Sequence, residues 1–266
     1  MSSSDDRFIL FVDFLGFSAA TQRFAKSAPD KEFSDEERGL LNLLHDIQKS
    51  DSRHSEGYSQ SSPESSSAVI NITPEFSAFS DHMVASYPLN FTDDVLPAPV
   101  RWELLLKEAL RIITPIALRA LDLGFLIRGG LTVGKLHHDA RVVFGAGFVE
   151  AYEIERSIAI YPRVALSHNL HTRLSYDDRT NYLIQDPDGI WHLDYFKKMC
   201  HQALETNSDK SGANAGKWKS ASLEMIDGQI ECLERRNKLK EKAKWVWFKN
   251  TLNDAIRKQN PAKFED

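Results

Sequence analysis

Apolar and polar positions alternate along the chain in two periods, which predict short strands and longer amphipathic helices. RFILFVD at 7–13 is a run of large apolar side chains typical of a buried strand. Apolar residues at three- and four-residue spacing predict helices, the longest of them interrupted by Pro115. We predict strands at 7–13, 68–73, 75–80, 82–88, 124–134 and 141–145, and helices at 16–27, 35–49, 99–123 and 146–157.

The order of these elements, β-α-ββ-α-β, predicts an α+β fold: a mainly antiparallel sheet with helices on one face. Ser80 and Asp81 lie between two extended runs, as in a hairpin turn. We expect this domain to span 1–195 and to carry a flexible Ser-rich loop at 51–67, with a mobile lid as the alternative.

The last part of the chain changes character. Two apolar stripes at helical spacing predict C-terminal helices: Leu223, Ile226, Ile230 and Leu233, then Trp245, Phe248, Leu252 and Ile256. We therefore expect a helical extension at 196–266 that packs on the main domain or on a partner subunit.

Composition narrows the class of protein. The 266 residues are 42% apolar and carry a formal charge of −5, which supports a folded core and argues against general nucleic-acid binding. Two cysteines make a disulfide framework improbable. The polar start is not a signal peptide, and no apolar run reaches the roughly 20 residues of a membrane span. The expectation is a cytoplasmic protein without a membrane partner.

Two aspartates stand at comparable places, Asp13 at the end of the first strand and Asp81 at the hairpin tip. In this order of elements the first strand lies beside the hairpin, so both carboxylates can meet at one sheet edge. Two adjacent carboxylates repel unless a cation lies between them, and oxygen ligands favour Mg²⁺ or Mn²⁺. Alone, Asp13 is also explained as a helix N-cap and Asp81 as a turn residue.

The turn after Asp13 offers a second half to such a site. Gly16 leaves room there, and the backbone N–H groups at the mouth of the next helix can bind phosphate oxygens. Paired carboxylates beside a phosphate cradle are what two-metal phosphoryl chemistry requires.

FVDFLGFS, FSDHMV, RGGLTVG, FGAGFVEAYEIE and YPRV, in that order, resemble the catalytic domain of class III nucleotidyl cyclases over residues 7–170. The similarity is closest to the bacterial pyrimidine cyclases of Pycsar anti-phage systems. The resemblance implies a ferredoxin-like sheet, a homodimer with active sites at its interface, and two Mn²⁺ or Mg²⁺ ions per site. The implied reaction converts a nucleoside triphosphate to a 3′,5′-cyclic monophosphate and diphosphate.

The resemblance also assigns residues. Asp13, Asp81 and the backbone carbonyl of Phe14 match the metal ligands. Ser77 and Val142 fall at the base-reading positions, where neither purine set of residues is present, which favours a pyrimidine by exclusion. The phosphate-holding turn matches Leu15, Gly16, Phe17 and Ser18.

One departure from the family concerns the residues that stabilise charge on the phosphorus. The family's Asn and Arg align with Val149 and Glu153. Five cationic residues are candidate substitutes, and Arg163 and Arg141 are preferred. The other three are Arg128, Lys135 and Arg156.

The sequence therefore predicts a uridylate cyclase that makes cyclic UMP as a second messenger in anti-phage defence. The alternatives are a cytidylate cyclase, a purine cyclase, an inactive nucleotide-binding module and another palm-type enzyme, for which no motif is present.

Overall fold

The computed structural model describes residues 5–24, 34–49, 57–59, 69–71, 73–90, 97–206 and 213–259. Most of the predicted loop at 51–67 lies outside these residues. Its described part, Gly57–Ser59 (β2), is a strand paired with Val69–Asn71 (β3), so the prediction of an unstructured loop is wrong there.

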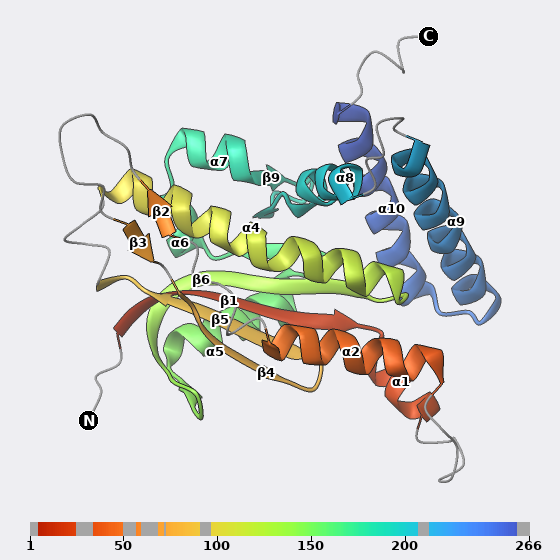
Figure 1. Ribbon diagram of the computed structural model, residues 1–266, viewed down its shortest axis with the longest axis horizontal. Helices are drawn as coiled ribbons and strands as arrows, with labels where there is room; N and C mark the ends of the chain where they lie inside the picture. The colour runs from red at the N-terminus through yellow and green to blue at the C-terminus, as the bar shows by residue number, and fades with distance from the viewer. Residues whose placement is uncertain are drawn as a thin grey trace.

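The fold is mixed α+β, built on an eight-stranded sheet that is antiparallel except where β6 meets β8. Strand β1 lies between β5 and β6 (Figure 1). The strand order is β4-β5-β1-β6-β8-β10-β9, and β7 pairs with the end of β6. The strands are β1 Asp5–Leu15, β4 Glu75–Phe79, β5 His82–Pro88, β6 Leu126–His138, β7 Val143–Phe144, β8 Val164–Leu166, β9 Leu183–Gln185 and β10 Trp191–Leu193.

The helices cover both faces of the sheet, so the prediction of helices on one face is wrong. Alternate residues of β1 explain why: Phe8, Leu10 and Val12 belong to the core under α4, and Ile9 and Phe11 belong to a second cluster under α5. The helices are α1 Phe17–Phe24, α2 Asp35–Lys49, α4 Ala98–Asp122, α5 Ala146–Glu153, the π-helical turn Ile154–Ile158, α6 His168–Arg173, α7 Tyr176–Tyr182, α8 Tyr195–Thr206, α9 Ala213–Arg235 and α10 Leu239–Gln259.

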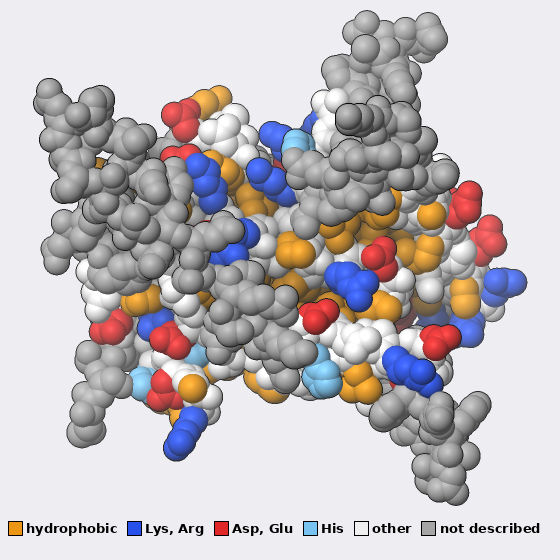
Figure 2. Space-filling model, viewed as in Figure 1, with side chains coloured by type: hydrophobic (Ala, Val, Ile, Leu, Met, Phe, Trp, Pro, Cys, Tyr) orange, Lys and Arg blue, Asp and Glu red, His pale blue; other side chains and the backbone are white. Residues whose placement is uncertain are grey.

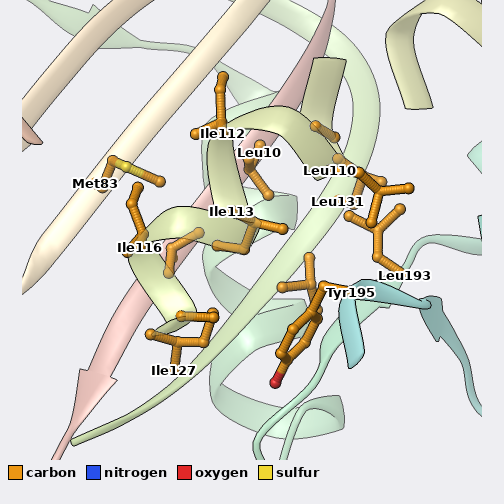
Figure 3. Close-up of a cluster of buried hydrophobic side chains, with 14 of the residues drawn as sticks. Leu10, Met83, Leu110, Ile112, Ile113, Ile116, Ile127, Leu131, Leu193 and Tyr195 are labelled. Carbon is orange, nitrogen blue, oxygen red and sulfur yellow. The ribbon is translucent and has the colours of Figure 1, made fainter. Parts of the chain in front are cut away.

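The larger core lies between α4 and the sheet. Ile112, Ile113 and Ile116 of α4 point toward Leu10 of β1 and Met83 of β5 (Figure 3). Pro115 stands on the exposed side of this helix, away from the sheet. Burial of such aliphatic side chains contributes about 1.5–3 kcal/mol each, so this layer holds α4 and the central strands together.

On the opposite face of the sheet, α5 lies unusually close to β6, with backbone packed directly against backbone. A Cβ atom on Gly130 would lie 2.1 Å from the carbonyl oxygen of Ala151, and one on Gly134 would lie 2.9 Å from the Cα of Gly147. The glycines of RGGLTVG therefore let α5 approach β6.

The C-terminal helices share the core of the sheet. Ile226 of α9 and Trp245, Phe248 and Leu252 of α10 belong to the same buried cluster as the α4 face. Both predicted stripes thus face inward, and the extension packs on the chain's own main domain, chiefly against α8.

Replacing Gly130 with alanine tests the close approach of α5. The added methyl group would collide with backbone that cannot move independently, so we expect a loss of about 1–3 kcal/mol in the free energy of unfolding. Urea unfolding measures it. Gly228→Ala is the control, because nothing lies within 4 Å of a Cβ there; in mid-helix it should stabilise by up to about 1 kcal/mol. Equal stability of both variants would contradict this packing.

Candidate functional site

The antiparallel register of β1 sets the centre of the candidate site. Asp13 lies opposite His82 of β5 on one side and opposite Arg128 of β6 on the other. Asp13 continues the Ile9–Phe11 side of β1, so all three side chains lie on the α5 face of the sheet.

The hairpin tip is fixed to the same strand. The backbone N–H of Phe14 donates a hydrogen bond to the carbonyl of Asp81 (3.2 Å), directly beyond the last β1–β5 pair. Ser80 turns the chain with φ 54°. Because the N–H and C=O of one strand residue point to the same edge, the Phe14 carbonyl also points toward this tip. The three predicted metal ligands are therefore brought together.

A histidine that the sequence analysis missed completes this group. His82 Nδ1 lies 3.2 Å from Asp81 Oδ1, and His82 Nε2 lies 3.7 Å from Asp13 Oδ1. One ligand atom from each of Asp13, Asp81 and His82 falls within 4.8 Å of the others. His82 follows Asp81 directly in the sequence, but only the strand register places it opposite Asp13.

A third carboxylate, also missed, lies behind Asp13. Arg128 Nε donates to Asp13 Oδ2 (3.1 Å), and Arg128 also pairs with Glu155 of the π-helical turn. Glu155 is 2% exposed. Burial, opposed by Arg128 and reinforced by Asp13, raises the pKa of Glu155 to about 7. Arg128 therefore holds two carboxylates at the floor of the site.

Helix α10 adds another cation from the far end of the chain. Burial and Arg128 lower the pKa of Lys244, whereas Glu241, Asp13 and Glu155 oppose that shift. Lys244 lines a cavity of about 310 Å³ together with Leu15 and Gly16 of the predicted phosphate turn and with Arg236 and Lys238. The C-terminal helices thus form one wall beside this turn.

The predicted phosphate turn has the expected shape. Gly16 adopts φ 100°, which favours glycine, and α1 begins at Phe17. The carbonyl of Gly16 accepts from the N–H of Ala20 (3.2 Å), so the N–H groups of Phe17, Ser18 and Ala19 precede the first intrahelical bond. Such N–H groups can bind an anion.

The base-reading candidates lie at a separate hollow on the same face. Ser77 and Arg141 line an open hollow of about 590 Å³ with Phe79 and Phe148. Val142 lies in the adjoining turn and is 48% exposed. Phe79 stacks on His82 with ring centroids 5.5 Å apart, which connects this hollow to the aspartate pair.

The cationic residues predicted as charge-stabilising candidates differ in burial and in their ion-pair partners. Arg163 is 2% exposed, and its guanidinium is bonded to Asp186 and Asp188. These two carboxylates already engage the Arg163 guanidinium, so Arg141 is the stronger candidate for the charge-stabilising group. Arg141 is exposed and lines the hollow. Arg156 is exposed on the π-helical turn. Lys135 lies 3.4 Å from Asp6.

The positions that depart from the family pattern lie on α5. Val149 is 56% exposed and Glu153 is exposed one turn later. They therefore face outward, and neither side chain carries the positive charge that the family's arginine supplies at this position.

The donor set fits a divalent cation. Carboxylate oxygens with one imidazole are ligands for Mg²⁺, Mn²⁺ or a later transition ion. Asp13 is 7% exposed and its two oxygens face different neighbours, Arg128 at Oδ2 and His82 at Oδ1. One oxygen of Asp13 therefore stays on the side of Asp81.

Comparisons with models of known protein families and with curated protein sequences give no match for this chain. Across the described segments, no helix combines the length and apolar character needed to span a bilayer. Lys and Arg are interspersed with Asp and Glu over the face seen in Figure 2. The resemblance to cyclases stays a prediction, which the geometry of the site must support by itself.

A buried histidine beside this site predicts how stability depends on pH. His138 bonds to Ser77 through Nε2 (2.9 Å) and to Ser86 through Nδ1 (2.8 Å). Burial and Arg7 lower the pKa of His138 from 6.5 to about 4. Between pH 6.5 and about 4 the histidine is protonated in the unfolded chain and neutral in the folded protein. The free energy of unfolding therefore falls as the pH falls through this range.

We expect a loss of up to about 2 kcal/mol from this group between pH 7 and 4.5. Urea unfolding at a series of pH values measures it. His138→Gln should give a flatter dependence than the wild type, and the exposed His168→Gln should leave the wild-type slope. Identical slopes for all three would contradict a neutral buried His138.

Proposed function

We propose that this protein is a metal-dependent nucleotidyl cyclase that converts UTP to 3′,5′-cyclic UMP and diphosphate. The observation that carries the proposal is the convergence of Asp13 and Asp81, 68 positions apart in the sequence, with ligand atoms within 4.8 Å of each other and of His82. Preference for UTP over CTP, and a role of the product as a second messenger in anti-phage defence, come from the sequence resemblance alone.

The strand order supports this reading. The elements β1, α1–α2, β4–β5, α4 and β6 follow β-α-ββ-α-β, and the sheet order β4-β5-β1-β6 is that of a ferredoxin-like unit. In this arrangement the first strand and the hairpin tip share an edge, which is where the two aspartates stand. Because one fold can host many activities, the side chains at the site carry the functional assignment.

The chain's own residues have distinct roles in the proposed reaction. Asp13, Asp81 and the Phe14 carbonyl hold the cations, and Arg128 keeps Asp13 oriented. The N–H groups of 17–19 bind the phosphates of the substrate. Bound divalent ions would supply the Lewis acid that lowers the pKa of the ribose 3′-hydroxyl and neutralises the triphosphate. The attacking and leaving oxygens then lie in line at phosphorus.

The base would lie in the hollow lined by Ser77 and Arg141. Ser77 presents a hydroxyl that is already bonded to His138, and it takes the place of the long base-reading side chains of purine cyclases. A neutral imidazole has one donor and one acceptor nitrogen, so His138 limits the direction in which the Ser77 hydroxyl can bond to a base.

A homodimer fits the exposed apolar side chains of this face. Phe79, Val142, Phe144 and Val149 are 57%, 48%, 74% and 56% exposed. They belong to β4, the β6–β7 turn, β7 and α5, the elements around the base hollow. Apolar side chains gathered on one face mark a contact surface, and a second copy of the chain is the proposed partner.

The central test is a product assay with each of the four nucleoside triphosphates and Mn²⁺, read by mass spectrometry. We expect cyclic UMP from the wild type. Asp13→Asn and Asp81→Asn should each lower the rate at least about 100-fold, because each removes charge that holds the cations. Asp254→Asn, on the exposed side of α10, is the matched control and should keep full activity. Full activity of Asp13→Asn would refute the mechanism.

A second test concerns the charge-stabilising group, now Arg141. Arg141→Ala should lower kcat by roughly 100-fold at unchanged melting temperature, because no described residue bonds to its guanidinium. Arg163→Ala should instead lower the free energy of unfolding by about 3 kcal/mol, at the low end for a broken buried pair, because Asp186 keeps His192 as a partner and Asp188 is 45% exposed. Thermal unfolding and kcat measured on both variants separate the two roles. Unchanged kcat in Arg141→Ala would remove it from the mechanism.

One observation favours a second candidate, an inactive cyclase-like module that binds a nucleotide and signals through α9 and α10. Val149 and Glu153 offer neither an amide nor a guanidinium where the family has both. Tight UTP binding without product, with Mn²⁺ present, would support this candidate over the enzyme.

A further inference from the structure

We propose that His82 is a direct ligand of the cation held by Asp13 and Asp81, and that this nitrogen makes the site select a transition ion such as Mn²⁺ over Mg²⁺. The inference rests on the proposed function for the role of the two aspartates as ligands. It adds a third side chain to the predicted ligands, and it adds a metal preference, neither of which the sequence resemblance supplies.

The position of the imidazole carries the inference. Its two nitrogens face different aspartates, Nδ1 toward Asp81 and Nε2 toward Asp13. Nδ1 is buried and makes no hydrogen bond within the described residues, although Asp81 Oδ1 lies 3.2 Å away. Nε2 is 3.7 Å from Asp13 Oδ1, beyond hydrogen-bond reach. A polar ring left unsatisfied between two carboxylates is completed by a cation.

These separations match those of two ligands on one ion. With metal–ligand bonds of about 2.0–2.2 Å, ligand atoms at right or tetrahedral angles lie roughly 2.8–3.6 Å apart. The 3.2 Å distance falls in this range and the 3.7 Å distance is just above it. Whichever nitrogen binds the ion, the other faces a carboxylate that can accept its N–H, an arrangement common among metal-binding histidines.

The ring is held in this orientation by aromatic neighbours. Phe79 stacks on it at 26° between planes, and Phe11 lies against it with centroids 5.5 Å apart. The β1–β5 pairing fixes its backbone opposite Asp13. A ligand held in place before the ion arrives loses little side-chain entropy on binding.

The chemistry of the ligand set gives the selectivity. Mg²⁺ prefers oxygen ligands in a nearly regular octahedron and retains its waters, whereas imidazole suits transition ions. Replacing one oxygen by the His82 nitrogen therefore favours Mn²⁺ relative to Mg²⁺.

The test uses the full chain and Mn²⁺ alone, with no nucleotide. Electron spin-echo envelope modulation of the bound Mn²⁺ reports a directly coordinated ¹⁴N nucleus. We expect this modulation in the wild type and in His168→Ala, the exposed control, and its loss in His82→Ala. Electron paramagnetic resonance titration should show Mn²⁺ affinity falling roughly tenfold or more in His82→Ala, while Mg²⁺ affinity, measured by competition, changes less than about threefold.

Each outcome decides a different point. Bound Mn²⁺ without ¹⁴N modulation in the wild type overturns this inference, whether or not His82→Ala folds, and leaves the aspartate pair and the cyclase proposal intact. Nitrogen modulation in a protein that turns over no nucleoside triphosphate keeps the inference and refutes the proposed activity. If the wild type binds no Mn²⁺ even at millimolar concentration, the assignment of His82 as a metal ligand is refuted.

Discussion

The pairing of β1 with β5 and β6 is the constraint on which the rest of the structure depends. It is antiparallel on both sides and places three polar side chains, those of Asp13, His82 and Arg128, in one row across the strands. A shift of one residue in either pairing would turn Asp13 into the α4 core and Phe14 out of it. Such a shift is opposed because both faces of β1 are buried, and it would put the carboxylate of Asp13 into the apolar core in place of Phe14. The core and the site are thus held by the same register.

That register places charge at the edge of an apolar interior, where charge is costly unless it is paired. Asp13 and Glu155 are both largely buried and share Arg128 between them. Burial, reinforced by Asp13 and opposed by Arg128, raises the pKa of Glu155 to about 7. Asp81 and His82 lie on the opposite side of Asp13, and a cation there would complete the balance of charge.

The sheet is covered differently on its two faces, and the difference decides where chemistry can occur. Under α4 the residues are aliphatic and close-packed. Under α5 the glycines at 130 and 134 bring backbone to backbone, which leaves the strand ends beyond that contact for polar side chains. Ser77, His82, Arg128 and His138 all stand on this face. The C-terminal helices then close the end of the site, since Lys244 and Trp245 of α10 share a cavity with Gly16.

Local pattern was enough to predict the four strands β4, β5, β1 and β6, the long helix, the hairpin tip at Ser80–Asp81 and the meeting of Asp13 with Asp81. These features depend on neighbours in the chain and on one topological rule, so their signals lie within short windows. Helices on both faces, the burial of Arg163 with Asp186 and Asp188, and the places of His82, Glu155 and Lys244 were decided by tertiary structure. Those residues act through partners between 23 and more than 200 positions away, and no periodicity within a segment encodes which distant segment will lie beside it.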